Sequence, residues 1–319
     1  MAFYLGIDTS NYTTSAAVYD DIAGTITHKK QLLPVKEGTL GLKQSDAVFS
    51  HVKQLSGIME QLFQTVSCTT LSAVGYSARP RDVFGSYMPC FLVGECSAVS
   101  VASALRVPVY DFSHQAGHIV AALFSVNRLD LIKERFIAFH VSGGTTDCLL
   151  VTPGREHLLE VTEIGTSLDL KAGQAVDRVG VLLGLPFPAG RYLEELALES
   201  TVRYKVTPTI RGQDCCLSGL ENICKRMFDE GAPRCDIARY CIAYIDATID
   251  KMTELALSKY GSRPLLYAGG VMSNSIIRAH LTQKYGGLFA QPEFSSDNAA
   301  GIAILTALKA RQLKKDDQA

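Results

Sequence analysis

The chain has 319 residues, with 31 basic and 32 acidic side chains and a formal net charge of −1. Hydrophobic residues make up 47% and charged residues 20%, a balance that allows a large buried core and excludes extensive disorder. The even charge excludes a protein that holds nucleic acid by bulk electrostatics alone, since that requires a strong basic excess. At roughly 150 residues per domain, the length predicts two domains or one large α/β unit.

The nine cysteines form no C-x-x-C pair, which excludes a zinc ribbon and a thioredoxin-type motif. We expect a reduced protein whose cysteines are mostly small buried hydrophobic residues. No apolar run reaches the roughly 18 residues of a membrane span, and no signal peptide precedes the first strand. The sequence therefore predicts a cytoplasmic protein without membrane contact.

Strands and helices alternate along the chain, each identified by its apolar period and its turn residues. The predicted elements are strands at 3–10 and 15–20, a helix over 46–63, a strand at 71–76, a helix over 94–105, a strand at 107–110, a helix after Ser113, strands at 136–141 and 146–151, helices over 170–183, 193–198 and 237–257, a strand at 264–270 and a helix over 299–313.

Two of these segments share a pattern of strand, small polar turn and strand. Thr13-Thr14 in the first hairpin and Thr145-Thr146 in the second lie 132 residues apart. An internal repeat of that size indicates a duplicated half rather than a solenoid. Together with the alternating helices, it predicts a mixed-sheet α/β protein of two similar halves, with the polar stretch 125–130 as the boundary.

The turns of both hairpins are candidate anion sites. Ser142, Gly143 and Gly144 let backbone N–H groups approach a phosphate closely, and the hydroxyl of Thr145 adds a donor. Asn11 holds the corresponding place in the first turn. An ordinary β-turn explains one such turn, but a pair at matching points favours a phosphate-binding function.

A second candidate is the strand that runs into Gly269-Gly270 and then into a helix at Asn274. Two glycines leave a flat backbone surface beside an electropositive helix end, on which an adenine or ribose could rest. Asn274 would then supply a directional hydrogen bond. The alternative is a simple helix cap.

A third candidate is His114-Gln-Ala-Gly-His118. Histidines at i and i+4 of a helix point the same way about one turn apart, so two imidazoles can converge on a metal. Asp297 is a possible third ligand, and such a set suits iron, zinc or manganese. A solvated or structural pair remains the alternative.

A fourth candidate is the segment that carries Asp169, Gly173 and Asp177, four residues apart. This spacing predicts one helix face with two carboxylates and a glycine between them. A mid-helix glycine costs about 1 kcal/mol against alanine, so we expect a close approach of another helix or a ligand there.

Taken in order, nine segments resemble the universal tRNA threonylcarbamoyladenosine synthase family, formerly called O-sialoglycoprotein endopeptidases. They are GIDTS at 6–10, FLVG at 91–94, HQAGH at 114–118, VSGG at 141–144, AGQAVD at 172–177, LGLPFP at 183–188, LSGL at 217–220, GGVMSN at 269–274 and DN at 297–298.

The resemblance implies the duplicated two-lobe α/β fold of actin, sugar kinases and Hsp70, with mixed sheets. It implies an N-terminal lobe over 1–127 with the histidine pair and a C-terminal lobe over 128–319 with the nucleotide site. The final helix, about 299–313, would pack back on the first lobe.

The resemblance also implies roles at matching positions. His114, His118 and Asp297 correspond to ligands of one divalent metal, iron or zinc. Ser142, Gly143 and Gly144 correspond to a phosphate-binding loop. Asp177, Gly190 and Asn274 correspond to residues that hold an adenine nucleotide or threonylcarbamoyl-adenylate, whose threonylcarbamoyl group passes to adenosine 37 of tRNA.

The sequence departs from the family pattern beside the reacting group. The usual Thr-Ser-Cys-Asp-Glu-Thr reads TSNYTT at 9–14, and the usual Ser-Gly-Gly-His-Thr has Thr145 in place of histidine. An Asp-Asp pair becomes Asp169-Leu170, a Gly-Gly becomes Ala189-Gly190, and an expected lysine is Glu221. These changes remove candidate acid–base residues and a possible RNA contact, which indicates a divergent paralogue.

Three functions remain open. The first is a metal-dependent transferase acting on tRNA, with a partner protein or homodimer through the N-terminal lobe and local basic patches such as Arg203, Lys205 and Arg211. The second is a nucleotide-binding scaffold or regulator without transfer chemistry. The third, a small-molecule kinase, would have to use Asp8 and Asp147.

Overall fold

The computed structural model describes residues 2–10, 12–34, 42–66, 70–155, 157–295 and 299–316. The chain forms two compact units. Unit 1 comprises Met1–Ile132, Pro153–Glu160 and Ser296–Ala319, and unit 2 comprises Lys133–Thr152 and Val161–Ser295. Among the described helices, none is both long enough and apolar enough to cross a bilayer.

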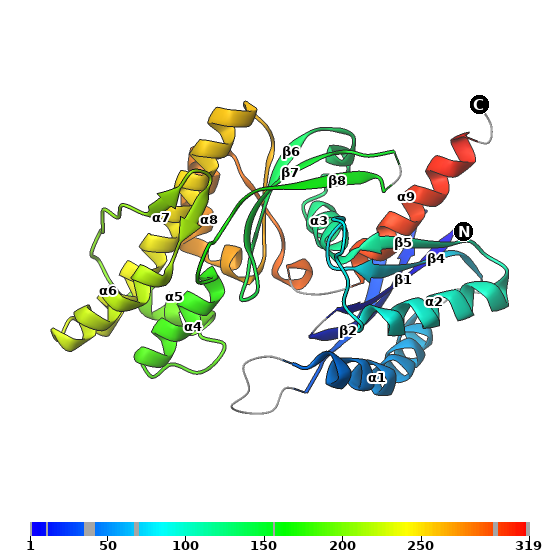
Figure 1. Ribbon diagram of the computed structural model, residues 1–319, viewed down its shortest axis with the longest axis horizontal. Coiled ribbons are helices and arrows are strands. Elements are labelled where there is room, and N and C mark those ends of the chain that lie inside the picture. Colours follow the sequence, from blue (N-terminus) through cyan, green and yellow to red (C-terminus); the bar gives the residue numbers. More distant parts are fainter. Residues whose placement is uncertain are drawn as a thin grey trace. The chain divides into compact units, whose positions relative to one another are not determined.

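Unit 1 is built on a five-stranded mixed sheet in the order β3-β2-β1-β4-β5 (Figure 1). Its strands are β1 (Phe3–Ser10), β2 (Thr13–Asp20), β3 (Thr25–Leu32), β4 (Leu71–Arg79) and β5 (Val109–Ser113). The first three strands pair antiparallel, whereas β4 and β5 run parallel to β1. Its helices are α1 (Gln44–Thr65), α2 (Phe91–Leu105), α3 (His114–Ser125) and α9 (Ala300–Asp316).

The alternation of side chains along β1 directs the two faces of this sheet to different helices. Leu5 and Ile7 pack in one apolar cluster with residues of α1 and α2. On the opposite face, a Cβ at Gly6 would collide with the backbone of α9 at Ala303. Glycine at this position therefore lets α9 lie directly on the sheet.

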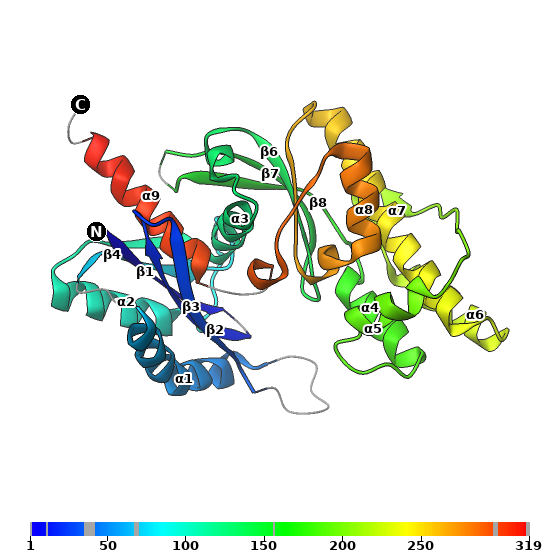
Figure 2. The ribbon, with the colours of Figure 1, turned by 180° about the vertical axis from the view of Figure 1, so that it is seen from behind.

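Unit 2 repeats the same plan in the strand order β12-β11-β6-β7-β8. Strands β6, β7 and β8 of this sheet are labelled in Figures 1 and 2. Its strands are β6 (Phe136–Val141), β7 (Thr146–Pro153), β8 (Leu159–Thr166), β11 (Leu265–Ala268) and β12 (Leu288–Phe289), with β9 (Thr209–Arg211) and β10 (Asp214–Cys216) as a separate ribbon. Its helices are α4 (Ala172–Leu182), α5 (Gly190–Leu198), α6 (Ser218–Asp229), α7 (Arg234–Tyr260) and α8 (Ser275–Tyr285). Short 3₁₀ turns are η1 (Leu129–Lys133), η2 (Gly270–Ser273) and η3 (Pro292–Phe294).

The duplication inferred from the two hairpins is confirmed by strand register. In unit 1, Thr9 pairs with Thr14, and in unit 2, Val141 pairs with Thr146. Each residue of the second pair follows its counterpart by 132 positions. The predicted fold class, a duplicated α/β protein with mixed sheets, is therefore correct.

Most cysteines behave as predicted. Of the eight described cysteines, five are buried, and none forms a disulfide. Burial raises the pKa of the Cys215 thiol to about 11, which keeps it protonated and unreactive.

Candidate functional site

A pocket of about 470 Å³ lies in unit 2 where α4, α5 and α8 begin. This volume is in the range of small-molecule and cofactor sites. Three helix N-termini in one place provide backbone N–H groups and partial positive charge. The pocket is lined by Ser142, Gly143, Gly173, Val176, Asp177, Pro188, Gly190, Arg191, Leu193, Glu194, Ile242, Ile245, Gly270, Val271, Ser273, Asn274 and Ile277.

The turn between β6 and β7 is fixed by its own hydroxyls. The Oγ of Ser142 accepts hydrogen bonds from the N–H groups of Gly144 and Thr145, each at 3.2 Å. The first turn of α4 lies against this loop, since Gly173 donates its N–H to the carbonyl of Ser142 at 3.0 Å. A Cβ at Gly173 would lie 2.6 Å from the nitrogen of Gly143. The close approach expected at Gly173 is therefore that of α4 to the turn between β6 and β7.

Asp177 stands one and a half turns into α4 and faces the start of α5. Its Oδ1 accepts the N–H of Ala189 at 2.9 Å, which places the next residue, Gly190, at the pocket wall. Burial raises the pKa of the Asp177 carboxyl above its ordinary value. A carboxylate in this setting can accept hydrogen bonds from ligand hydroxyls.

The segment after β11 forms the opposite wall. Gly269 has a φ of +99°, and a Cβ there would collide with the carbonyl of Val141, so only glycine fits. Gly270 opens η2 and lines the pocket. The Oδ1 of Asn274 caps α8 by accepting from Ile276 at 3.1 Å, which leaves its Nδ2 as the donor for a ligand. Asn274 is therefore the cap of α8, and it also lines the pocket.

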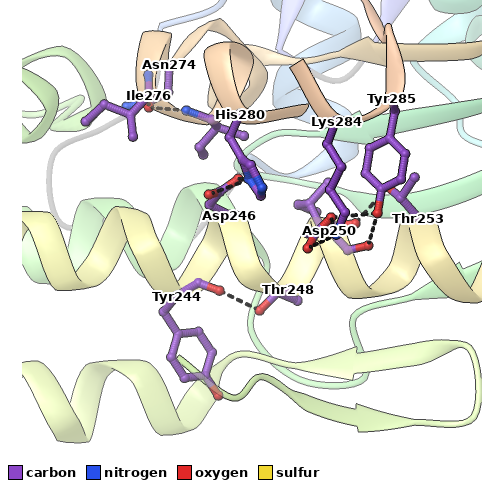
Figure 3. A network of polar contacts seen from close by, with 12 residues as sticks. Tyr244, Asp246, Thr248, Asp250, Thr253, Asn274, Ile276, His280, Lys284 and Tyr285 are labelled. Atoms are coloured by element: carbon purple, nitrogen blue, oxygen red, sulfur yellow. Dashed lines mark hydrogen bonds and ion pairs between the residues drawn. The ribbon is translucent and has the colours of Figure 1, made fainter. Parts of the chain in front are cut away.

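The C-terminal half of helix α8 is anchored on α7 by polar contacts (Figure 3). His280 contacts Asp246 at 2.9 Å, and Lys284 donates to Asp250 at 2.7 Å. Tyr285 also donates to Asp250, and its own burial, together with this carboxylate, raises the pKa of the Tyr285 hydroxyl. These contacts give Asn274 a rigid support.

Glu194 is a pocket residue that the sequence reasoning missed. Its Oε1 accepts the N–H of Ser275 at 2.8 Å and so joins α5 to the start of α8. The two residues are 81 positions apart, and no local pattern links them. A carboxylate at this place can also accept a hydrogen bond from a ribose hydroxyl.

The structure brings most predicted nucleotide residues together. Gly144, Thr145 and Gly269 belong to the turns beside the pocket, and Asn11 lies outside the described residues. The predicted residues that line it are Ser142, Gly143, Asp177, Gly190, Gly270 and Asn274.

The histidine pair lies in unit 1, on the first two turns of α3. The Oγ of Ser113 accepts the N–H of Ala116 at 3.2 Å, which confirms the predicted cap. The Nε2 atoms of His114 and His118 face each other at 2.9 Å. Two imidazole lone pairs approach this closely only with a proton or a cation between them. The donor set therefore fits one iron or zinc ion.

The predicted third ligand, Asp297, lies outside the described residues. Within the ranges that the structure describes, no three His, Cys, Asp or Glu side chains converge as a complete metal site. A metal held by His114 and His118 would therefore need ligands beyond the groups that converge in the described residues.

The prediction of one helix face carrying Asp169, Gly173 and Asp177 was wrong. Helix α4 begins at Ala172, so Asp169 precedes it and Gly173 lies in its first turn, not at its middle. Asp169 instead caps α6, because its carboxylate accepts the N–H of Leu217 at 2.7 Å and the hydroxyl of Ser218 at 2.6 Å. Burial opposes the charge, but these bonds outweigh it and lower the pKa of Asp169 to about 2.

The chain matches the family model described as tRNA N6-adenosine threonylcarbamoyltransferase over residues 23–304. Solved structures share its fold at low sequence identity. The activator of 2-hydroxyisocaproyl-CoA dehydratase from Clostridium difficile, with bound ADPNP, has a TM-score of 0.53 and 13% identity, covering 98% of this chain and 97% of that one. HypF from T. kodakarensis has a TM-score of 0.59 and 14% identity, covering 99% and 48%.

A glucokinase of the ROK family from Streptomyces griseus, in complex with glucose and AMPPNP, has a TM-score of 0.50 and 13% identity, covering 96% of this chain and 100% of that one. These likenesses establish the actin and sugar-kinase type of fold. The family match extends over most of both units. The chain therefore belongs to the tRNA N6-adenosine threonylcarbamoyltransferase family, a family of transferases.

Proposed function

We propose that this protein transfers the threonylcarbamoyl group of threonylcarbamoyl-adenylate to adenosine 37 of tRNA in a metal-dependent reaction. The observation that carries the proposal is the pocket of unit 2, in which an anion-binding turn, a carboxylate and three helix N-termini surround about 470 Å³. This pocket has the size and the polar groups to hold an adenylate. The family match supplies the reaction class.

In this proposal, each group of pocket residues binds the part of the adenylate that its chemistry suits. The backbone of Ser142 and Gly143, with the positive end of α4 behind it, binds the phosphate. Asp177 and Asn274 hold the nucleoside through a carboxylate acceptor and an amide donor. The apolar side chains on α7 and α8, such as Ile245 and Ile277, exclude water from the base. Binding of an adenine nucleotide in a related fold, seen in the dehydratase activator, supports this assignment.

His114 and His118 would hold the metal, together with Asp297. A divalent ion bound there would supply Lewis-acid polarisation of a carbonyl or phosphoryl oxygen. The first hairpin loop lacks the two acidic residues of the family pattern, so this loop cannot supply a carboxylate for acid–base catalysis.

Both partner predictions stay proposals. The exposed side chains of Arg203, Lys205 and Arg211 support a local contact with tRNA phosphates. Exposed apolar residues on the helices of the N-terminal lobe, Val52 of α1 and Leu92 of α2, support a partner protein or homodimer there. We also propose a cytoplasmic location.

The test is a transfer reaction with purified protein, threonylcarbamoyl-adenylate, tRNA and the partner proteins used by the family. Nucleosides are then measured by mass spectrometry. We expect threonylcarbamoyladenosine with the wild type and strongly reduced product with Asp177→Asn. A protein that binds the nucleotide but forms no threonylcarbamoyladenosine would overturn the proposed transferase activity.

One observation favours a second candidate, a nucleotide-binding regulator without transfer chemistry. Thr145 occupies the position of the family's loop histidine, and its Oγ1 lies 2.9 Å from the Oγ of Ser142, inside the turn. At another altered position, Glu221 forms an ion pair with Arg178 at 2.8 Å. The regulator predicts nucleotide affinity equal to that of an active enzyme, with no product in the same assay.

A further inference from the structure

We propose that Asp8 is a positioning residue for the metal site, which it serves by holding the ring of His114 through its Nδ1–H. This inference deepens the proposed function, because it rests on a metal at the histidine pair. Asp8 lies on β1, 106 residues from His114.

The geometry places Asp8 behind the histidine and not at the metal. Its Oδ1 lies 3.1 Å from the Nδ1 of His114, while the Nε2 of the same ring faces His118 at 2.9 Å. The two nitrogens lie on opposite sides of the imidazole. A carboxylate at Nδ1 is therefore out of reach of an ion at Nε2.

The contact fixes the tautomer of His114. The Oδ1 of Asp8 already acts as an acceptor for the hydroxyl of Ser77, so its contact with His114 pairs it with an Nδ1–H, and Nε2 keeps its lone pair for a metal. A carboxylate that accepts from the second nitrogen of a ligating histidine orients the ring and increases its basicity. Asp8 and His114 form this arrangement.

The carboxylate itself is rigidly held. Asp8 is fully buried, and its Oδ1 also accepts the hydroxyl of Ser77, on β4. Its Oδ2 is buried without a hydrogen-bond partner among the described residues. A buried carboxylate with an unsatisfied oxygen is costly, and such costs concentrate at functional sites.

The test is metal affinity of the metal-free protein, titrated with Co²⁺ or with Zn²⁺ against a chelator. We expect Asp8→Ala to weaken binding by about 10- to 100-fold, the range found for such outer partners, and Asp8→Asn to weaken it less. Asp147→Asn is the matched control, because Asp147 is an equally buried carboxylate on the second hairpin, in unit 2. It should leave metal affinity unchanged.

A second measurement reads the tautomer of His114 directly. In ¹⁵N NMR of the metal-free wild type, His114 should be in the Nδ1–H tautomer, and Asp8→Ala should shift it toward a mixture. An Nε2–H tautomer in the wild type, wild-type affinity in Asp8→Ala, or a wild type that binds no metal would each overturn the inference. Failure of tRNA modification with the affinity loss intact would instead overturn only the proposed function.

Discussion

Gly143 and Gly173 approach each other so closely that no side chain fits between them. A Cβ at Gly173 would lie 2.6 Å from the nitrogen of Gly143, and the N–H of Gly173 is bonded to the preceding carbonyl of Ser142. The turn between β6 and β7 and the N-terminus of α4 are therefore one structural unit, and disturbing one displaces the other.

Gly173→Ala should displace the turn and weaken binding of ADP by at least tenfold, because the backbone atoms it meets cannot move independently. Isothermal calorimetry measures the affinity. Gly219→Ala is the matched control: it is also the second residue of a helix, α6, with nothing within 4 Å of an added Cβ. It should leave binding unchanged and stabilise the fold by up to about 1 kcal/mol. Equal affinities in the two variants would contradict the close contact.

Asp177→Asn should weaken ADP binding and yet raise stability at pH 7. Burial raises the folded-state pKa of Asp177 above 3.8, so its charge opposes folding once the pH exceeds that raised value. Removing the charge removes this penalty, while the amide oxygen can still accept from Ala189.

The pH dependence of this variant follows from the same shift. As the pH falls through the raised pKa, above 3.8, wild-type Asp177 takes up a proton and stability rises, an effect that the variant lacks. Chemical denaturation between pH 4 and 7 measures both proteins. The assignment fails if their stability difference is constant over that range.

Asp169→Asn should destabilise unit 2 at neutral pH by about 1 kcal/mol, because hydrogen bonds to a charged acceptor contribute about that much more than bonds to a neutral amide. The pKa of Asp169 is lowered to about 2, so its stabilisation is complete above pH 4 and is lost as the pH falls from 4 to 2. The free energies of unfolding of wild type and variant should therefore become equal as the pH falls from 4 to 2. A difference in unfolding free energy that persists at pH 2 would argue against the role of the Asp169 carboxylate as a cap.

His118→Ala should abolish stoichiometric metal binding, because a lone imidazole from α3 cannot replace two converging Nε2 atoms. Elemental analysis of reconstituted protein should give one metal per wild-type chain and none for the variant. His280→Ala is the control, since His280 contacts Asp246 on α7 and lies in unit 2. A His118→Ala protein that still binds one metal per chain would show that His118 is not a metal ligand.

Local patterns predicted what depends on local sequence. The 132-residue offset between the Thr-Thr pairs anticipated the register of both hairpins, and Ser113 anticipated the cap of α3. The four-residue spacing of Asp169, Gly173 and Asp177 led to a wrong prediction of one helix face. Such a spacing does not show where the helix begins. Asp169 is instead held by Leu217, 48 positions away.

Contacts between residues far apart in the sequence could not be predicted from the sequence alone. Glu194 meets Ser275 and Asp8 meets His114 only because the folded sheets and helices bring them together. The sequence identified Asp8 as a possible kinase residue, whereas the structure places it against a histidine. Recognising such pairs requires the tertiary structure.

The most direct measurement is threonylcarbamoyladenosine at position 37 of tRNA, made by metal-stripped protein with and without one equivalent of Fe²⁺ or Zn²⁺. Threonylcarbamoyl-adenylate and the family's partner proteins are supplied, and nucleosides are quantified by mass spectrometry. Product should appear with metal and be lost in His118→Ala. Equal product without metal, or none under any condition, would contradict the account.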